Sequence, residues 1–150
     1  MQYEQNIEEL LLQGKNIRVS PQGYSMYPVL VPERDQVVIE PIAGVKVKRG
    51  DVVLYRRTPD AGGILVLHRV WKCTAEGIYL VGDNQTEIEG PLQKEQIKGI
   101  MVGIQREEKF LSVTHPLYRL CTGGWLLVRP FRRYFMKVAA CIKQLLKKVK

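Results

Sequence analysis

The sequence predicts one mainly β domain of coiled antiparallel sheets, with a short N-terminal helix and C-terminal amphipathic helices. The chain of 150 residues is long enough for one domain with a real core and too short for two ordinary ones. Five segments are rich in valine and isoleucine and bounded by Gly, Pro, Asp or Asn, as strands are. They are residues 36–40, 51–56, 64–71, 78–81 and 97–105. Because the chain becomes basic and helical after residue 108, we divide it into a domain of residues 1–108 and a tail of residues 109–150.

The first predicted element is a short amphipathic helix. Ile7, Leu10 and Leu11 share one face, two glutamates lie opposite, and Gly14 ends the helix. The predicted strands follow it. Between the second and third of them, residues 58–63 contain a proline and two glycines, which is typical of a hairpin loop.

The tail carries the positive charge of the chain. Residues 109–150 contain ten Lys or Arg and no Asp or Glu, whereas residues 1–108 contain 13 basic and 15 acidic residues. From Phe131 to Val149, apolar residues recur at alternating steps of four and three, which predicts one apolar stripe on a helix. Pro116 and Pro130 suit helix starts, and Gly123-Gly124 suits a break between helices.

The tail has two interpretations that the pattern supports equally. Trp125 and the segment from Phe131 to Lys150 resemble an interfacial helix on an anionic membrane surface. Alternatively, the apolar stripe docks on the sheet and the cations are solvated. We expect no nucleic acid partner, because no recognition motif accompanies the basic face.

The sequence also predicts the cellular location of the protein. Residues 1–12 lack the basic region and apolar run of a signal peptide. The most apolar stretch, residues 120–128, is far shorter than the roughly 20 residues that a membrane span needs. We therefore expect a cytoplasmic protein, or one that is peripheral on the inner face of the membrane. The three cysteines lack metal-ligand spacing, and neither a metal nor an organic cofactor is implied.

The chain contains the side chains that acyl transfer needs. A serine is a poor nucleophile at neutral pH, so it requires a neighbouring base and a third group that holds the base. Ser25 lies between a glycine and a proline, in a loop that can present a side chain to a groove. His68 lies on an apolar strand, where partial burial would keep the imidazole neutral. The non-catalytic alternatives are a turn serine and a core histidine.

Five short motifs, in this order, resemble the peptidase superfamily of type I signal peptidases and self-cleaving SOS repressors. They cover about residues 17–106 and are Ser25-Met26-x-Pro28, Arg49-Gly50-Asp51-Val52-Val53, His68-Arg69-Val70, Gly82-Asp83-Asn84 and Ile97-Lys98-Gly99. Bacterial members carry a lysine base where this chain has His68. The resemblance is therefore closer to the endoplasmic-reticulum and archaeal branch, and it implies the fold of the signal peptidase and repressor C-terminal domains.

The resemblance implies a serine endopeptidase that processes a precursor or leader peptide. Ser25 would be the nucleophile and His68 the base. Glu89 matches the position of the acid in the histidine-type triad, and Asp83 is a supporting or alternative acid. Family members use the nucleophile's backbone amide for the oxyanion, and some add a serine hydroxyl two residues earlier, where this chain has Gly23.

The resemblance also implies where a substrate binds. The peptide would lie extended between residues 18–23 and 64–67, and main-chain hydrogen bonds would hold it. The residues expected to contact it are Gly23, Tyr24, Met26, Val66 and Leu67.

Two other functions compete with peptide processing. A repressor-like self-cleaving regulator would need a DNA-binding domain and a scissile bond before Ser25, whereas the Ala61-Gly62 pair comes after it. A non-catalytic module would keep the fold and use the tail to hold a membrane or a partner.

Overall fold

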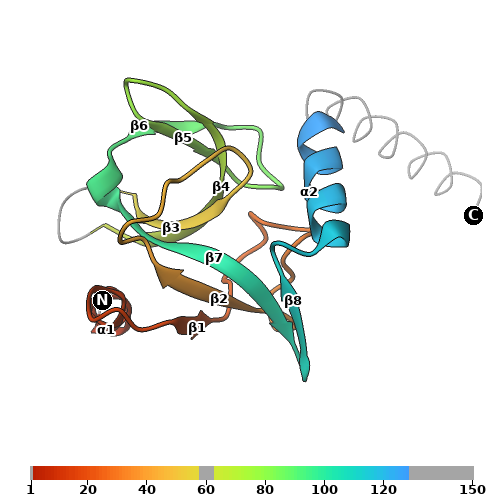
Figure 1. Ribbon diagram of the computed structural model, residues 1–150, viewed down its shortest axis with the longest axis horizontal. Helices are drawn as coiled ribbons and strands as arrows, with labels where there is room; N and C mark the ends of the chain where they lie inside the picture. The colour runs from red at the N-terminus through yellow and green to blue at the C-terminus, as the bar shows by residue number, and fades with distance from the viewer. Residues whose placement is uncertain (1, 58–62, 129–150) are drawn as a thin grey trace, which may run out of the picture.

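An eight-stranded antiparallel sheet forms the body of the protein (Figure 1), in the order β1-β2-β7-β3-β4-β5-β6 with β8 paired to β7. The computed structural model describes residues 2–57 and 63–128. The strands are β1 (Ile17–Val19), β2 (Gln36–Pro41), β3 (Val52–Arg56), β4 (Leu65–Cys73), β5 (Ile78–Val81), β6 (Glu89–Leu92), β7 (Ile97–Arg106) and β8 (Lys109–Ser112). The helices are α1 (Gln2–Leu12) and α2 (Pro116–Val128), with a 3-10 turn at Lys94–Gln96. The prediction of a mainly β, antiparallel fold is confirmed.

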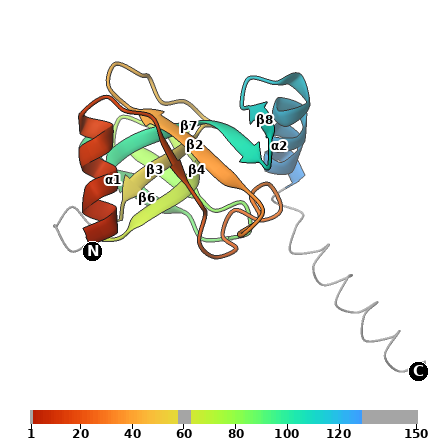
Figure 2. The same cartoon turned by 90° about the horizontal axis from the view of Figure 1, so that it is seen from below.

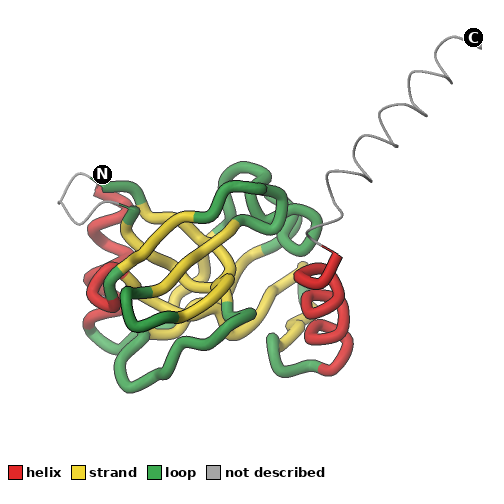
Figure 3. Tube along the Cα trace, turned by 90° about the horizontal axis from the view of Figure 1, so that it is seen from above, coloured by secondary structure: helices red, strands yellow, loops and turns green. Residues whose placement is uncertain are grey.

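The two helices lie at opposite ends of the sheet, as Figure 2 shows. Figure 3 shows the strands crossing one another in the space between them. Bulges interrupt the pairing of β2 with β7 and of β3 with β7. Because a bulge bends its strand and increases the local twist, these irregularities coil the sheet.

Strand β3 is buried on both faces and separates two apolar cores. Since successive side chains of a strand point to opposite faces, Val52 and Leu54 pack into the first core, and Val53 and Tyr55 pack into the second. The first core is Ile7, Leu11, Ile17, Met26, Leu30, Val37, Ile39, Val52, Leu54, Met101, Ile104 and Tyr118. The second core is Val53, Tyr55, Val70, Ile78, Leu80, Leu92 and Ile97.

Three strands are not among the five that the Val- and Ile-rich segments predict. β1 has only three residues, and β6 contains Gly90 and Pro91, which are unfavourable in strands. β8 lies in the basic segment that we expected to be helical, and it pairs with the end of β7. The sheet therefore extends beyond the boundary drawn at residue 108.

Helix α1 forms as its amphipathic pattern predicts. Ile7 and Leu11 are buried in the first core, and Gly14 follows the helix with a φ of 78°. Glu8 also pairs with Arg56 of β3 at 2.8 Å, so an ion pair as well as apolar packing holds α1 against the sheet.

Helix α2 begins at Pro116, as expected, but it continues through Gly123 and Gly124. The prediction of a break at these glycines is wrong. Tyr118 and Thr122, one turn apart, are both buried against the sheet, and the Thr122 hydroxyl donates to the Tyr118 carbonyl at 2.8 Å. Tertiary packing therefore outweighs the cost of about 1 kcal/mol that each glycine adds.

Neither α1 nor α2 is long and apolar enough to cross a membrane. The helix predicted from Phe131 to Val149, and most of the hairpin loop predicted at residues 58–63, lie outside the described residues. The strands that this loop connects, β3 and β4, do pair antiparallel.

An ion pair in the interior ties β4 to the turn that follows β5. The Arg69 guanidinium donates two hydrogen bonds to the carboxylate of Asp83, both of 2.7 Å, and both side chains are almost fully buried. A third Arg69 nitrogen donates to the Gly50 carbonyl at 2.9 Å. Since a buried charge without its partner is strongly unfavourable, each member of the pair fixes the place of the other.

Replacing Asp83 by Asn should therefore destabilise the protein by about 3–5 kcal/mol, because the change leaves the Arg69 charge buried without a counter-charge. Urea unfolding measures this difference. Glu87→Gln, at an exposed position in the same loop, should shift the free energy of unfolding by no more than about 0.5 kcal/mol. Equal stability of the two variants would contradict this role of the pair.

Candidate active site

His68 is a buried histidine on β4 whose Nδ1 faces polar partners. Nδ1 lies 3.1 Å from the hydroxyl of Tyr55 and 3.5 Å from a carboxylate oxygen of Glu89. Tyr55 reaches it from β3, because Val53 pairs with His68 and Tyr55 is the next residue on the same face. The two rings are 5.8 Å apart between centroids. Two neighbouring strands therefore fix the orientation of the imidazole.

Glu89, the first residue of β6, receives hydrogen bonds from two sides. The Tyr55 hydroxyl donates to one carboxylate oxygen at 2.5 Å. Arg57 donates to both oxygens, at 2.6 Å and 3.1 Å. The Glu89 carboxylate is thus held as an anion between a phenol and a guanidinium, on the Nδ1 side of His68.

The surroundings shift the pKa values of this group in opposite directions. Burial lowers the pKa of His68, although the Glu89 charge opposes this effect. For Glu89, burial raises the pKa, but the hydrogen bonds from Arg57 and Tyr55 outweigh it, so the pKa is lowered. Burial, together with the hydrogen bond to Glu89, raises the pKa of Tyr55. At neutral pH the group therefore holds a neutral imidazole, a protonated phenol and a carboxylate.

These protonation states determine the tautomer of His68. The Tyr55 proton points to Glu89, so the Tyr55 oxygen can only accept a hydrogen bond from His68 Nδ1–H. A neutral imidazole has one ring proton, which leaves Nε2 as an unprotonated base. In the described part of the chain, Nε2 has no hydrogen-bond partner.

Ser25 is held in place through its backbone. Its carbonyl accepts a hydrogen bond of 2.7 Å from the amide of Asn84, in the turn after β5. Gly82 of the same turn lies so close that an added Cβ would be 2.7 Å from the Ser25 oxygen. The next side chain, Met26, is buried in the first core. The Ser25 amide itself donates to no group among the described residues.

The serine and the histidine line one cleft of about 400 Å³, which we call the Ser25–His68 cleft. Its lining residues are Ile7, Val19, Ser20, Pro21, Gln22, Gly23, Ser25, Met26, Leu54, Arg57, Ile64, Leu65, Val66, Leu67, His68 and Gln85. Among the described residues no hydrogen bond joins the Ser25 hydroxyl to His68. The two groups come from segments that are 43 positions apart in the sequence, and the fold brings them to the same groove.

Two strand edges border the cleft. β1 pairs only with β2, and β4 pairs with β5 only from Arg69 onward. Within the described strands, the outer edge of β1 and one edge of residues 66–68 are therefore without a strand partner. Edges of this kind can pair with an extended peptide.

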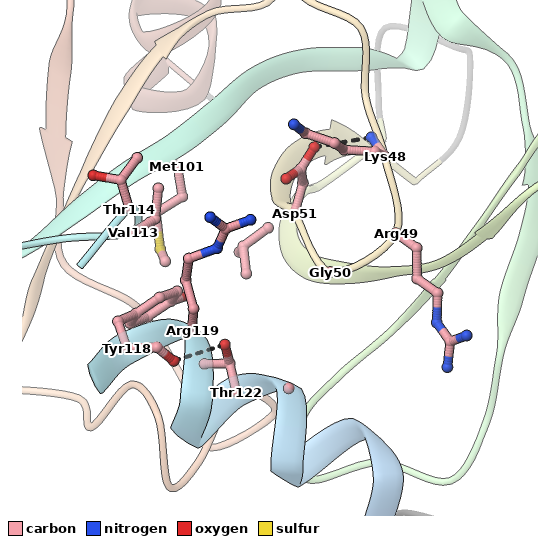
Figure 4. Close-up of a pocket in the computed structure, with 12 residues that line it drawn as sticks. Lys48, Arg49, Gly50, Asp51, Met101, Val113, Thr114, Tyr118, Arg119 and Thr122 are labelled. Carbon is pink, nitrogen blue, oxygen red and sulfur yellow. Dashed lines mark hydrogen bonds between the residues drawn. The ribbon is translucent and has the colours of Figure 1, made fainter. Parts of the chain in front are cut away.

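A larger cavity, of about 550 Å³, lies between residues 48–52 and α2 (Figure 4) and includes neither Ser25 nor His68. In Figure 4, Arg119 extends from α2 toward the side where Asp51 lies, and Arg49 points away. Burial raises the pKa of Asp51, although the Lys48 amide donates a hydrogen bond to its carboxylate. Because Arg119 extends toward a carboxylate of the protein itself and Arg49 lies over the Trp71 ring, we assign no ligand to this cavity.

The structure brings together most of the residues that the sequence singled out. Ser25, His68 and Glu89 belong to one site, and four of the five expected substrate contacts, Gly23, Met26, Val66 and Leu67, line the cleft. Tyr24 does not line it, and this residue is 64% exposed. The predicted membrane contacts, the Trp125 side chain and the segment from Phe131 to Lys150, lie outside what is described.

Asp83 has a different place from the one expected of an acid that orients the base. Both of its carboxylate oxygens accept hydrogen bonds from Arg69. Glu89 is the acid that lies against His68 Nδ1. Asp83 acts instead on the shape of the site, because it fixes the turn whose Asn84 holds Ser25.

Sequence reasoning missed Tyr55, Arg57 and Gln85. Tyr55 lies in an apolar strand, so the sequence pattern predicts a core residue. Arg57 follows that strand directly, so the pattern predicts a residue of the hairpin loop. The alternation of β3 does place Tyr55 on the face of Val53, which pairs with His68, so a correct register would have found it.

Comparison with known proteins identified no significant match. No family model matches the chain, and no curated protein or solved structure matches it significantly.

Replacing Gly82 by Ala should displace the Ser25 segment, since the new methyl group would meet a backbone oxygen that cannot rotate away. We expect a destabilisation of about 1–3 kcal/mol and faster hydrogen exchange of the Asn84 amide. Gly123→Ala is the matched control, because its added Cβ would meet nothing within 4 Å other than the backbone of its own helix. If Gly82→Ala kept both the stability and the slow exchange, this packing would not hold Ser25.

Proposed function

We propose that the protein is a serine endopeptidase of the signal-peptidase type, in the histidine branch, that cleaves a precursor or leader peptide. One observation carries the proposal. Ser25 and His68 line the same cleft, and Tyr55 and Glu89 lie against the Nδ1 atom of His68. This arrangement supports a nucleophile, a neutral base and an orienting acid, which are the parts that acyl transfer by serine requires.

In the proposed reaction, Ser25 Oγ attacks the substrate carbonyl carbon and its proton passes to His68 Nε2. The imidazolium that forms is stabilised by Glu89, directly and through Tyr55. The proton then passes to the leaving amine as the peptide bond breaks. A water molecule, deprotonated by the same nitrogen, hydrolyses the acyl-enzyme and restores the serine.

The proposed substrate is an extended segment that pairs with the outer edge of β1 and with the edge of residues 66–68 beside the cleft. The walls of the cleft include aliphatic side chains of moderate size, such as Val19, Leu65 and Leu67. They suit the small apolar residues that the resemblance implies before the cleaved bond. We propose that this activity is in the cytoplasm or at the inner face of a membrane, with Trp125 and the segment from Phe131 to Lys150 as the membrane contact.

Ser25→Ala should abolish processing, because the alanine methyl group cannot form the acyl-enzyme. Candidate precursors are incubated with the wild type or the variant, and the peptides are identified by mass spectrometry. Ser112→Ala, on β8 outside the cleft, is the matched control and should process like the wild type.

Identical peptide profiles from the wild type and Ser25→Ala would refute the proposal and leave the binding module as the better account. A loss of intact mass of the protein itself, with matching fragments and dependence on Ser25, would favour the self-cleaving regulator.

The pH dependence of kcat/KM should follow the protonation of His68. Since burial lowers the pKa of His68, activity should rise with pH through an apparent pKa below 6.5. In Glu89→Gln, the charge that raises the His68 pKa is lost and the Arg57 charge that lowers it remains. The acidic limb should therefore move to still lower pH.

The plateau rate of Glu89→Gln should also fall, because the imidazolium loses its counter-charge. Glu87→Gln, an exposed carboxylate nearby, controls for the change of net charge and should leave the profile unchanged. An acidic limb that stays in place or moves to higher pH in Glu89→Gln would show that Glu89 does not act on His68.

A further inference from the structure

Attack by Ser25 creates a negative charge on the substrate carbonyl oxygen, and this charge needs hydrogen-bond donors. Serine peptidases typically supply two. The Ser25 amide can be one of them, because it donates to no group among the described residues. Gly23 has no side chain with which to supply the other. A second donor would then come from water or from another part of the cleft.

Gln85 is fixed on the turn that holds the Ser25 backbone. Its amide N–H donates to the Gly82 carbonyl at 3.0 Å and closes the turn. The preceding residue, Asn84, donates to the Ser25 carbonyl at 2.7 Å. The backbone of Gln85 is thus linked to Ser25 by short, direct contacts, and Asp83, paired with Arg69, anchors the same turn in the interior.

The side-chain amide of Gln85 lies beside the Ser25 backbone. A Cβ built on Gly82 would be 2.6 Å from the Gln85 Oε1 and 2.7 Å from the Ser25 carbonyl oxygen. Both oxygens therefore lie next to Gly82. Gln85 is half-buried and lines the Ser25–His68 cleft. Rotation about the last side-chain bond exchanges the amide oxygen and nitrogen, so the NH₂ group can point into the cleft.

The Gln85 amide is also the polar group of the cleft that is best suited to this task. It has no hydrogen-bond partner in the described part of the chain. Arg57, in contrast, is engaged by Glu89. Ser20 and Gln22 line the cleft, but both are exposed, and a donor in water is worth less than one in a water-poor site.

We propose that Gln85 is a catalytic residue whose Nε2–H donates a hydrogen bond to the oxyanion. As Ser25 Oγ bonds to the carbonyl carbon, the electron pair of the C=O bond moves to oxygen and the serine proton goes to His68. Gln85 transfers no proton, and its hydrogen bond strengthens as the oxygen becomes an anion. This inference rests on the proposed peptidase activity.

Gln85→Ala and Gln85→Glu test the proposal. Both remove the donor, but Glu keeps the size of the side chain and adds a charge that repels the oxyanion. We expect kcat to fall about 10²–10³-fold in Gln85→Ala and further in Gln85→Glu, with KM nearly unchanged. Binding of a peptide boronic acid, which forms a tetrahedral adduct with serine, should weaken by a similar factor, whereas binding of the uncleaved substrate to variants that also carry Ser25→Ala should not.

Gln36→Glu is the control, because it makes the same change at an exposed position on β2, outside the cleft. Thermal unfolding of each variant separates loss of the donor from loss of the fold. A Gln85→Ala enzyme with wild-type kcat would overturn the proposal, even if Gln85→Glu were impaired, because charge repulsion alone would then explain the defect. A rise in KM with unchanged kcat would also overturn it.

The outcome for Gln85 can be separated from the outcome for the peptidase. If the wild type cleaves a precursor and Ser25→Ala does not, while the Gln85 variants match the wild type, only the role of Gln85 fails. If Ser25→Ala cleaves as well as the wild type, the proposed function fails and the role of Gln85 fails with it.

Discussion

The buried ion pair of Arg69 and Asp83 is the constraint on which the rest of the site depends. Arg69 is the neighbour of His68 on β4, and Asp83 belongs to the turn whose Asn84 holds the Ser25 carbonyl. One interaction in the interior therefore links the strand of His68 to the turn that holds Ser25, the proposed base and nucleophile. Since an unpaired buried charge is so unfavourable, the pair makes this arrangement specific even where it adds little net stability.

On the other side of the imidazole, burial and charge act against each other. Desolvation favours neutral His68, as the proposed general base requires, but it would also oppose the imidazolium of the proposed reaction. Glu89 provides the opposing charge, and Tyr55 and Arg57 keep Glu89 ionised in a partly buried place. Because Tyr55 donates to Glu89 and accepts from His68, it also fixes which ring nitrogen is free.

The parts that could be predicted from the sequence are those that leave a local pattern. The five Val- and Ile-rich strands β2, β3, β4, β5 and β7, helix α1 and the start of α2 follow from periodicity and from Gly and Pro. β1, β6 and β8 form because a neighbouring strand offers an edge, and α2 passes its two glycines because Tyr118 and Thr122 pack on the sheet. Such tertiary causes are invisible in a window of sequence.

The residues of the site also divide into those that the sequence indicates and those that depend on tertiary structure. Ser25, His68 and Glu89 were found through the resemblance, but the roles of Tyr55, Arg57 and Asp83 depend on which strands pair and in which register.

The central claim is that His68 activates Ser25 as a nucleophile, and the rate of covalent labelling by a fluorophosphonate tests it most directly. Intact mass and peptide mapping should show one adduct, on Ser25, that forms faster as pH rises through a value below 6.5 and is absent from His68→Ala. Absence of an adduct on Ser25, or labelling at the same rate in His68→Ala, would contradict the account.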